Sequence, residues 1–450
     1  MEKSSALTAG PSARQLWLGL VLGAILRALL LPLPGSPDVG SWKMWSFVGA
    51  FDATGLYGVG GNPPERRLLR WQDIAGTTEY PPLALYEMAA AGRVYWSMDK
   101  TFKDSRVLTA LIKAPGLLAE MLFVAAILIW GRRTSGESAG RWIALAFWLN
   151  PAIILNGAAL GYLDAQMAVP AALSLVAAGL GFPAVAGALI AAAILTKAQA
   201  LFVGPVVLLA ILLRDRASMR AAFVRFAAGG AIAAALILLP IVARGAWPNM
   251  VQAVSRLAAH DMLSGNALNA WWIVTWLTRA IYALDLGWFT AFTMPVRILG
   301  VTRFMEIGGP NAKTIGAGVL LVLLAWALWH SRKGRSLAGW AFVAGWSVFA
   351  YTMFSAQVHE NHLYLAVPML AVAAGLSREY RRAFWAVSLI AAFNMYVFYG
   401  LSDGWPSLIN RRWTVIDVTV IASFVNLGVF VWMTRLIPVR LHEENAQSSP

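Results

Sequence analysis

The hydrophobic residues of this chain gather into repeated runs, and polar segments separate one run from the next. Many runs approach twenty residues, the length at which an α-helix crosses the hydrocarbon core of a bilayer. A transmembrane β-barrel would instead show alternating segments of about ten residues. The pattern therefore predicts an all-α polytopic membrane protein with about twelve spans. These are 15–34, 111–130, 142–158, 166–181, 184–196, 199–213, 226–243, 313–330, 336–355, 362–376, 383–400 and 414–436.

Two long polar stretches interrupt the hydrophobic pattern, at 35–110 and 244–312. In the first, Trp42, Trp45 and Val48 recur at helical spacing, which predicts a helix lying in the membrane interface over 39–53. Residues 82–96 form a second candidate interfacial helix. Residues 266–299 are aromatic enough to hold a helical pair, which would raise the count to fourteen spans. A single domain is expected over 1–440, followed by a disordered tail at 441–450.

Charge fixes the expected orientation. The 36 Lys and Arg residues exceed the 22 acidic residues and give a net charge of +14. The basic residues cluster in short loops between hydrophobic runs, which places those loops and both chain ends in the cytoplasm, and argues against a nucleic-acid partner. The two long stretches are then outer loops. The absence of cysteine excludes disulfide and thiolate chemistry.

The first outer loop carries the best candidate for chemistry. Asp38 follows the first hydrophobic run, where a carboxylate beside low-dielectric surroundings becomes a better general base. Its alternative role is to cap the helix at 39–53. At the end of the loop, Glu79 and Tyr80 precede two prolines that suit a first helical turn. They are candidates to order a sugar, or Glu79 simply faces the positive end of that helix.

Several other polar residues stand at helix ends. Asp164 lies in a short apolar turn and needs a partner, unless it only caps the next helix. Lys197 and Gln199 lie in a turn between two helices too short to cross the membrane unless that turn lies in a cavity. A phosphate would satisfy Lys197, and the alternative is that it snorkels to the surface.

A late segment contains His359, Glu360 and His362. The two histidines would share one helical face, but they lack a third metal ligand, so donation of hydrogen bonds to a phosphate is favoured over metal binding. Arg411 and Arg412 break the charge bias in the last outer loop. They are candidates to clamp a phosphate or pyrophosphate, or form a surface pair for lipid headgroups.

Taken together, these motifs resemble the GT-C superfamily of glycosyltransferases that use polyprenyl- or dolichyl-phosphate sugars. The shared features are an acid after the first helix, Glu79-Tyr80-Pro81-Pro82, a Lys-x-Gln turn at Lys197, and Val358-His359-Glu360. The nearest groups are the glucosyltransferases that extend lipid-linked oligosaccharide and the bacterial relatives of the second mannosyltransferase of the glycolipid-anchor pathway. Glu79 stands where the eukaryotic enzymes usually have Asp, and Asn361-His362 stands where they have Lys-Ala.

The resemblance implies an inverting hexosyltransferase of a bacterial inner membrane, with its site on the periplasmic face and Asp38 as general base. It would move glucose or mannose from a polyprenyl-phosphate donor to a hydroxyl of a lipid-linked glycan or glycolipid. No cofactor and no metal are expected. The rival class is a lipid or lipid-linked glycan transporter without catalysis, for which inverted repeats and matching broken helices would be expected.

Overall fold

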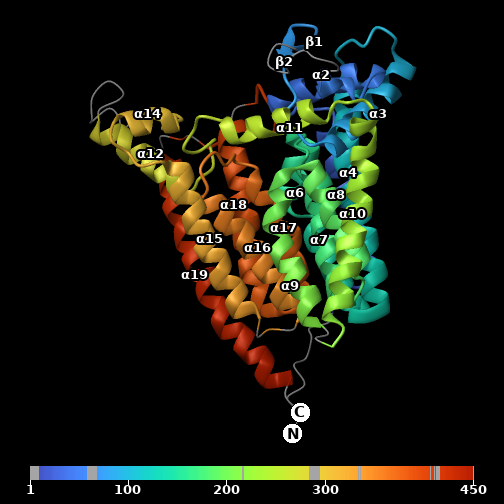
Figure 1. Cartoon of the computed structure of the whole chain (residues 1–450), viewed down its shortest axis with the longest axis vertical. Coiled ribbons are helices and arrows are strands. Elements are labelled where there is room, and N and C mark those ends of the chain that lie inside the picture. Colours follow the sequence, from blue (N-terminus) through green and yellow to red (C-terminus); the bar gives the residue numbers. More distant parts are fainter. Residues whose placement is uncertain are drawn as a thin grey trace.

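The structure is a computed structural model, described here over residues 10–57, 68–214, 217–282, 294–332, 334, 336–405, 407–409, 411 and 416–448. It is a bundle of long, roughly parallel helices with a cap of shorter elements across one end (Figure 1). In the described part of the chain, seven helices are long and apolar enough to cross a membrane. They are α1 (Ala13–Leu30), α4 (Arg106–Trp130), α10 (Met219–Ala243), α15 (Ala312–Ser331), α16 (Leu337–Phe354), α18 (Arg381–Tyr399) and α19 (Val418–Ser448).

An eighth span is possible where two helices meet at a bend of 46°. The bend separates α5 (Glu137–Trp148) from α6 (Pro151–Ile154) and the π-helix η4 (Leu155–Leu160). Pro151 lacks an amide hydrogen and Asn150 accepts a hydrogen bond from the Ala152 amide, so a new helix starts here. Four shorter apolar helical segments complete the bundle, namely α7 (Asp164–Leu180), α8 (Pro183–Thr196), η5 with α9 (Ala198–Phe202 and Gly204–Arg214) and η7 with α17 (His362–Leu365 and Ala366–Leu376).

Each predicted span coincides with helix, and the total of about twelve crossings stays a prediction. The expected helical pair at 266–299 appears as α12 (Ala270–Ile281), and 283–293 lie outside the described residues. Helix α19 is described to Ser448, and the disordered tail expected at 441–450 stays a prediction.

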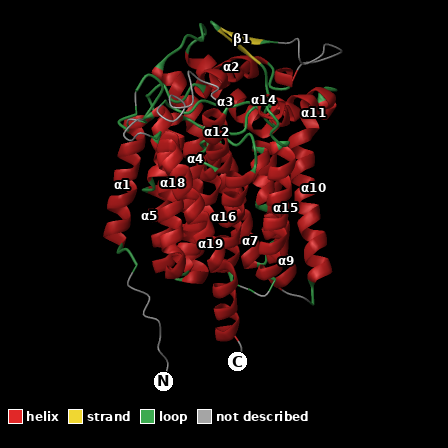
Figure 2. Ribbon diagram, turned by 90° about the vertical axis from the view of Figure 1, so that its left-hand side faces the viewer, coloured by secondary structure: helices red, strands yellow, loops and turns green. Residues whose placement is uncertain are grey.

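The cap at one end consists of short elements. It holds α2 (Asp38–Phe51), α3 (Pro82–Met98), α11 (Trp247–Ser255) and α14 (Val301–Glu306), with the antiparallel strands β1 (Leu69–Trp71) and β2 (Ile74–Gly76) pairing Arg70 with Ala75 (Figure 1). Helix α1 begins and α19 ends at the opposite end of the bundle (Figure 2). The remaining short helices are η1 (Gly55–Tyr57), η3 (Gly131–Ser135), η6 (Arg256–Ala259) and η8 (Arg378–Tyr380).

The core lies around α16 and α17. Of the apolar window of α16, 83% is buried inside the protein, whereas only 6% of that of α10 is. Helix α10 packs on α8 through small residues, because a side chain at Gly187 would meet the Phe226 carbonyl and one at Gly229 would meet the Ala184 carbonyl. Close backbone approach of this kind is typical of helix pairs in membranes, so α10 is a peripheral helix whose remaining surface suits lipid.

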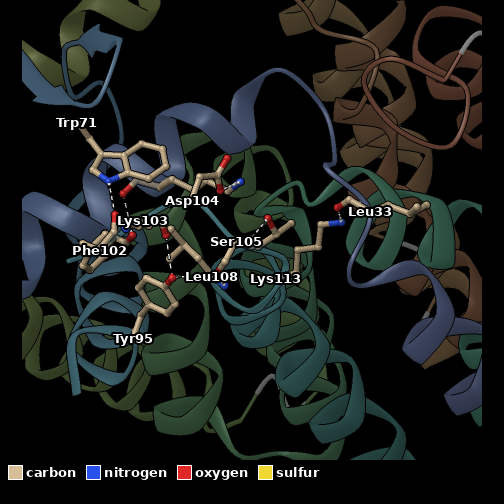
Figure 3. A network of polar contacts seen from close by, with 12 residues as sticks. Leu33, Trp71, Tyr95, Phe102, Lys103, Asp104, Ser105, Leu108 and Lys113 are labelled. Atoms are coloured by element: carbon tan, nitrogen blue, oxygen red, sulfur yellow. Dashed lines mark hydrogen bonds and ion pairs between the residues drawn. The ribbon is translucent and has the colours of Figure 1, made fainter. Parts of the chain in front are cut away.

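Beneath the cap, Lys113 of α4 connects the segment before α2 to the π-helix η4. Its amine is buried and donates to the carbonyl oxygens of Leu33, Ala158 and Ala159 at 2.8, 3.0 and 2.8 Å. Figure 3 shows Lys113 reaching Leu33, next to the hydrogen bonds that tie Tyr95 to Lys103 and Trp71 to Phe102. The start of α2 is thereby anchored to the helical bundle.

Candidate active site

A cavity of about 600 Å³ lies between the cap and the helical bundle. Its walls come from α2, the segment before α3, the turn after α8, the end of η6, the end of α16 and the segment that follows α16. The residues that line it include Asp38, Trp42, Trp45, Glu79, Tyr80, Lys197, Gln199, Leu201, Phe202, His260, Tyr351, His359, Asn361 and His362. Polar residues predicted separately along the chain therefore meet around one space.

Asp38 is the first residue of α2, and Pro37 occupies the N-cap position. The expected capping role is therefore wrong in position, and no hydrogen bond to the Asp38 carboxylate occurs within the described residues. The side chain is exposed to the cavity while protein surrounds it on most sides, and this desolvation raises the pKa of Asp38. A carboxylate without a partner and with a raised pKa is suited to accept a proton from a hydroxyl.

Lys197 and Asp164 form a buried ion pair beside Asp38. The Lys197 amine donates to Asp164 Oδ1 at 2.6 Å, and the side-chain amides of Asn156 and Asn361 each donate to Asp164 Oδ2 at 2.8 Å. Asp164 is wholly buried and does not line the cavity, whereas Lys197 does. Asp164 therefore positions the amine rather than contacting a ligand, and Lys197 does not snorkel to the surface.

Three aromatic rings form one wall of the cavity. The Trp42 ring lies 4.6 Å from Trp45 and 5.2 Å from Tyr80, and Trp45 lies 5.3 Å from Tyr80, measured between centroids. The Lys197 amine lies 5.5 Å from the Tyr80 ring. The indole N–H of Trp42 is buried and has no hydrogen-bond partner. Such a wall offers an apolar face together with an unused donor.

The two histidines of the late segment have different roles. They were predicted to share one helical face, but the residues before His362 form a turn, and the 3₁₀-helix η7 begins only at His362. Both ring nitrogens of His362 are occupied, by Gln199 at 3.1 Å and by the Tyr351 hydroxyl at 2.9 Å. His362 is therefore fixed in the wall, and donation to a phosphate would require the loss of one of these bonds.

His359 is the histidine available to a ligand. Its Nδ1 lies 3.9 Å from Glu360 Oε2, too far for a hydrogen bond, and its side chain is 38% exposed. Desolvation, with help from Lys197, lowers the pKa of His359 to about 4, so it is a neutral N–H donor at neutral pH. Glu360 lies behind the wall, where it accepts a hydrogen bond from Tyr162 at 2.6 Å.

Glu79 pairs with a histidine instead of the helix end. Helix α3 begins at Pro82 with Pro81 as its N-cap, so Glu79 precedes the first turn. Its carboxylate lies 3.0 Å from His260 Nε2, and this hydrogen bond raises the pKa of His260. The His260 and His359 rings lie 6.1 Å apart. Even so, the described residues contain no group of three or more His, Asp or Glu side chains arranged to hold a metal ion.

The arginines of the last outer loop lie elsewhere. Arg411 donates to Asp417 Oδ2 at 2.9 Å and to the Val296 carbonyl at 2.8 Å, and it does not line the cavity. Arg412 lies outside the described residues. Among the residues that line the cavity, Lys197 is thus the one Lys or Arg.

Several residues of the site could not be singled out from the sequence. Tyr351 and Asn361 act on His362 and Asp164 through contacts between helices, and Tyr162 acts on Glu360 across 198 positions of the chain. The one available signal was a polar side chain within an apolar run, since such groups need a hydrogen-bond partner when buried.

No family model and no curated protein matches this chain. It is similar to the Archaeoglobus fulgidus oligosaccharyltransferase in the apo form, at a TM-score of 0.41 and 12% identity over 96% of this chain and 56% of that one. The same values hold for the archaeal oligosaccharyltransferase AglB of that organism in complex with an inhibitory peptide and a dolichol-phosphate. The chain spans about half the length of these structures.

Proposed function

We propose that this protein is an inverting glycosyltransferase of the GT-C type. It moves a hexose, glucose or mannose, from a polyprenyl-phosphate donor to a hydroxyl of a lipid-linked glycan or glycolipid at the extracytoplasmic face of a membrane. The observation that carries the proposal is a single cavity in which an unpartnered carboxylate, Asp38, shares the walls with the Lys197 amine and the His359 imidazole.

The reaction is a single displacement at the anomeric carbon. Asp38 takes the proton of the acceptor hydroxyl while the acceptor oxygen forms a bond to that carbon. The bond between the carbon and the phosphate oxygen breaks at the same time, and the electron pair leaves with the lipid phosphate. One displacement inverts the configuration. A second carboxylate is unnecessary because phosphate is already a good leaving group, unlike the alcohol that a glycosidase must protonate.

The leaving phosphate needs groups that stabilise its developing charge. Lys197 supplies the one lysine or arginine charge among the cavity walls, and Asp164 already balances part of it. His359 is an uncharged donor. This balance supports a donor with a single phosphodiester charge over a pyrophosphate, which carries more charge and would call for more cations.

The donor's lipid chain has a route into the cavity. Leu201 and Phe202 of η5 line it in the same segment of chain as Lys197, and Leu201 is 58% exposed. A polyprenyl chain on this apolar surface would hold its phosphate near Lys197. The wall formed by Trp42, Trp45 and Tyr80 provides rings for the sugar.

The rival function is lipid transport without chemistry. Transport by alternating access requires a site near the middle of the bilayer, between helices broken in matching halves. The residues that line the cavity come instead from the cap and from the ends of the bundle helices beneath it, and its polar residues lie at helix ends and in loops. Figure 1 shows the cap across one end of the bundle. This position favours transfer at one membrane face.

Purified protein incubated with polyprenyl-phosphate glucose and polyprenyl-phosphate mannose tests the proposal. Release of lipid phosphate with transfer of the sugar to an added glycolipid acceptor is expected for one of the donors. If no donor is cleaved, while vesicles containing the protein move a labelled lipid-linked sugar between leaflets, the protein is a transporter.

A further inference from the structure

A second cavity, of about 570 Å³, lies beside α2. Trp42 and Trp45 line the first cavity, whereas Lys43 lines the second, so the two lie against different faces of this helix. They share no lining residue. The second cavity is bounded by the segment after α1, the start of α4 and the loop before α19, through Leu29, Pro32, Leu33, Pro34, Lys43, Asp104, Ser105, Arg106, Thr109 and Trp405.

Positive charge predominates around the second cavity. Lys43 is buried and donates to Asp104 at 2.7 Å, while Arg106 is exposed in the cavity wall. Among the residues that line this cavity, the two cations Lys43 and Arg106 thus stand against the single carboxylate of Asp104.

The position of Arg106 is unfavourable for the helix that contains it. Arg106 is the first residue of α4, a helix of 25 residues with no acidic residue in its first turn. A cation at the positive end of a helix is destabilising, because it adds to the partial charge of the free amides. An anion held between Arg106 and Lys43 would remove this repulsion.

The other wall of the second cavity is apolar and faces the surroundings of the bundle. Leu29 is 68% exposed near the end of α1, a helix with only 22% of its apolar window buried inside the protein. Pro32 to Pro34 continue this wall, and Trp405, 53% exposed, stands across from it. Tryptophan and basic side chains beside lipid-facing leucines are typical of the headgroup level of a bilayer.

We propose that the second cavity binds the phosphate headgroup of an anionic membrane lipid. Lys43 and Arg106 hold the phosphate, Ser105 and Thr109 line the polar floor, and the acyl chains leave along Leu29 and α1. The volume suits a headgroup, since small-molecule sites generally span about 300–1,000 Å³. This site does not depend on the proposed transferase reaction, and it would bind lipid whether or not Asp38 acts as a base.

Native mass spectrometry of the full-length protein, released from nanodiscs containing phosphatidylglycerol, tests the proposal. Retention of one phosphatidylglycerol per protein is expected. Arg106→Gln should weaken retention about five- to tenfold, the effect of one basic residue at an anionic headgroup. Asp104→Asn should strengthen it several-fold, because Lys43 loses its competing carboxylate. Lys100→Gln is the matched control, since Lys100 lies on the same cap and does not line the cavity.

Opposite shifts in Arg106→Gln and Asp104→Asn support the site even if a Lys43 variant fails to fold. Equal retention of phosphatidylcholine would overturn it, because an apolar groove alone would then explain binding. Displacement of the lipid by millimolar glycerol phosphate would also overturn it, since a soluble anion would then suffice. Unchanged retention in both variants would place the lipid elsewhere on the protein.

Discussion

Asp38→Asn tests whether the Asp38 carboxylate acts as a base, because it changes the chemistry of the first cavity while leaving its structure intact. The substitution keeps the size of the side chain and removes its ability to accept a proton. No described hydrogen bond ends on the Asp38 carboxylate, so folding should be almost unchanged. Asp164 differs in this respect, because Lys197, Asn156 and Asn361 all donate to it.

The expected loss of rate follows from the role of a general base. Such a group contributes roughly 10²–10⁴-fold, or about 3–5 kcal/mol at the transition state. The pKa of Asp38 is raised by its surroundings, which strengthens it as a base and places the effect within this range. Donor affinity should stay within about twofold, because Asp38 does not hold the phosphate.

Single-turnover release of lipid phosphate measures the rate, and binding of a non-cleavable donor analogue measures affinity. Asp52→Asn serves as the control, because Asp52 flanks the other end of α2 and, within the described residues, its carboxylate accepts hydrogen bonds from Thr54 and Gly55 alone. If Asp38→Asn retained more than about a tenth of the parent rate, Asp38 would not be the base. A loss of donor binding equal to the loss of rate would assign Asp38 to binding instead.

Three further predictions concern stability and protonation. Asp164→Leu should lower the free energy of unfolding by about 3–5 kcal/mol, because it leaves Lys197 buried without a partner. Adding Lys197→Met should restore most of the lost melting temperature. Equal melting temperatures of the parent and the single variant would contradict this. Glu79 raises the pKa of His260, so their contact stabilises the fold fully at pH below the unfolded-state pKa of about 6.5. This stabilisation is lost as the pH rises through the folded-state pKa. Glu79→Gln should lower the pKa of His260 in an NMR titration, and an unchanged pKa would show that the pair does not form. Gly229→Leu should separate α10 from α8 and lower the melting temperature, whereas Gly318→Leu, where a side chain meets open space, should not; equal effects of the two would refute this packing.

The helices of the bundle were predictable from the sequence because each depends on the hydropathy of a local run. Helix α2 was predictable for a similar reason, from the spacing of Trp42 and Trp45. The ends of the helices were harder to predict from the sequence. Pro37 occupies the cap position expected of Asp38, and the helix expected at His359 starts only at His362, because a hydrogen-bonded turn precedes it.

The partners of the polar residues could not be predicted. The sequence indicated that Asp164 and Lys197 each needed a partner, but not that each satisfies the other across 33 positions. Glu79 likewise finds His260 across 181 positions. Arg411 was a reasonable candidate for phosphate by charge alone, and only the position of Asp417 reveals its actual partner. Pairing between helices depends on how they pack, and local patterns contain no record of it.

The lipid-facing position of α10 links the cavity to the physical state of the membrane. This helix offers most of its surface to lipid, and the Tyr86 hydroxyl of α3 donates to its Ile237 carbonyl at 3.1 Å. Helices that meet a bilayer of unmatched thickness tilt. A tilt of α10 would pull on α3, which starts two residues after Tyr80 in the aromatic wall. A change in hydrocarbon thickness would thereby act on the aromatic wall of the cavity.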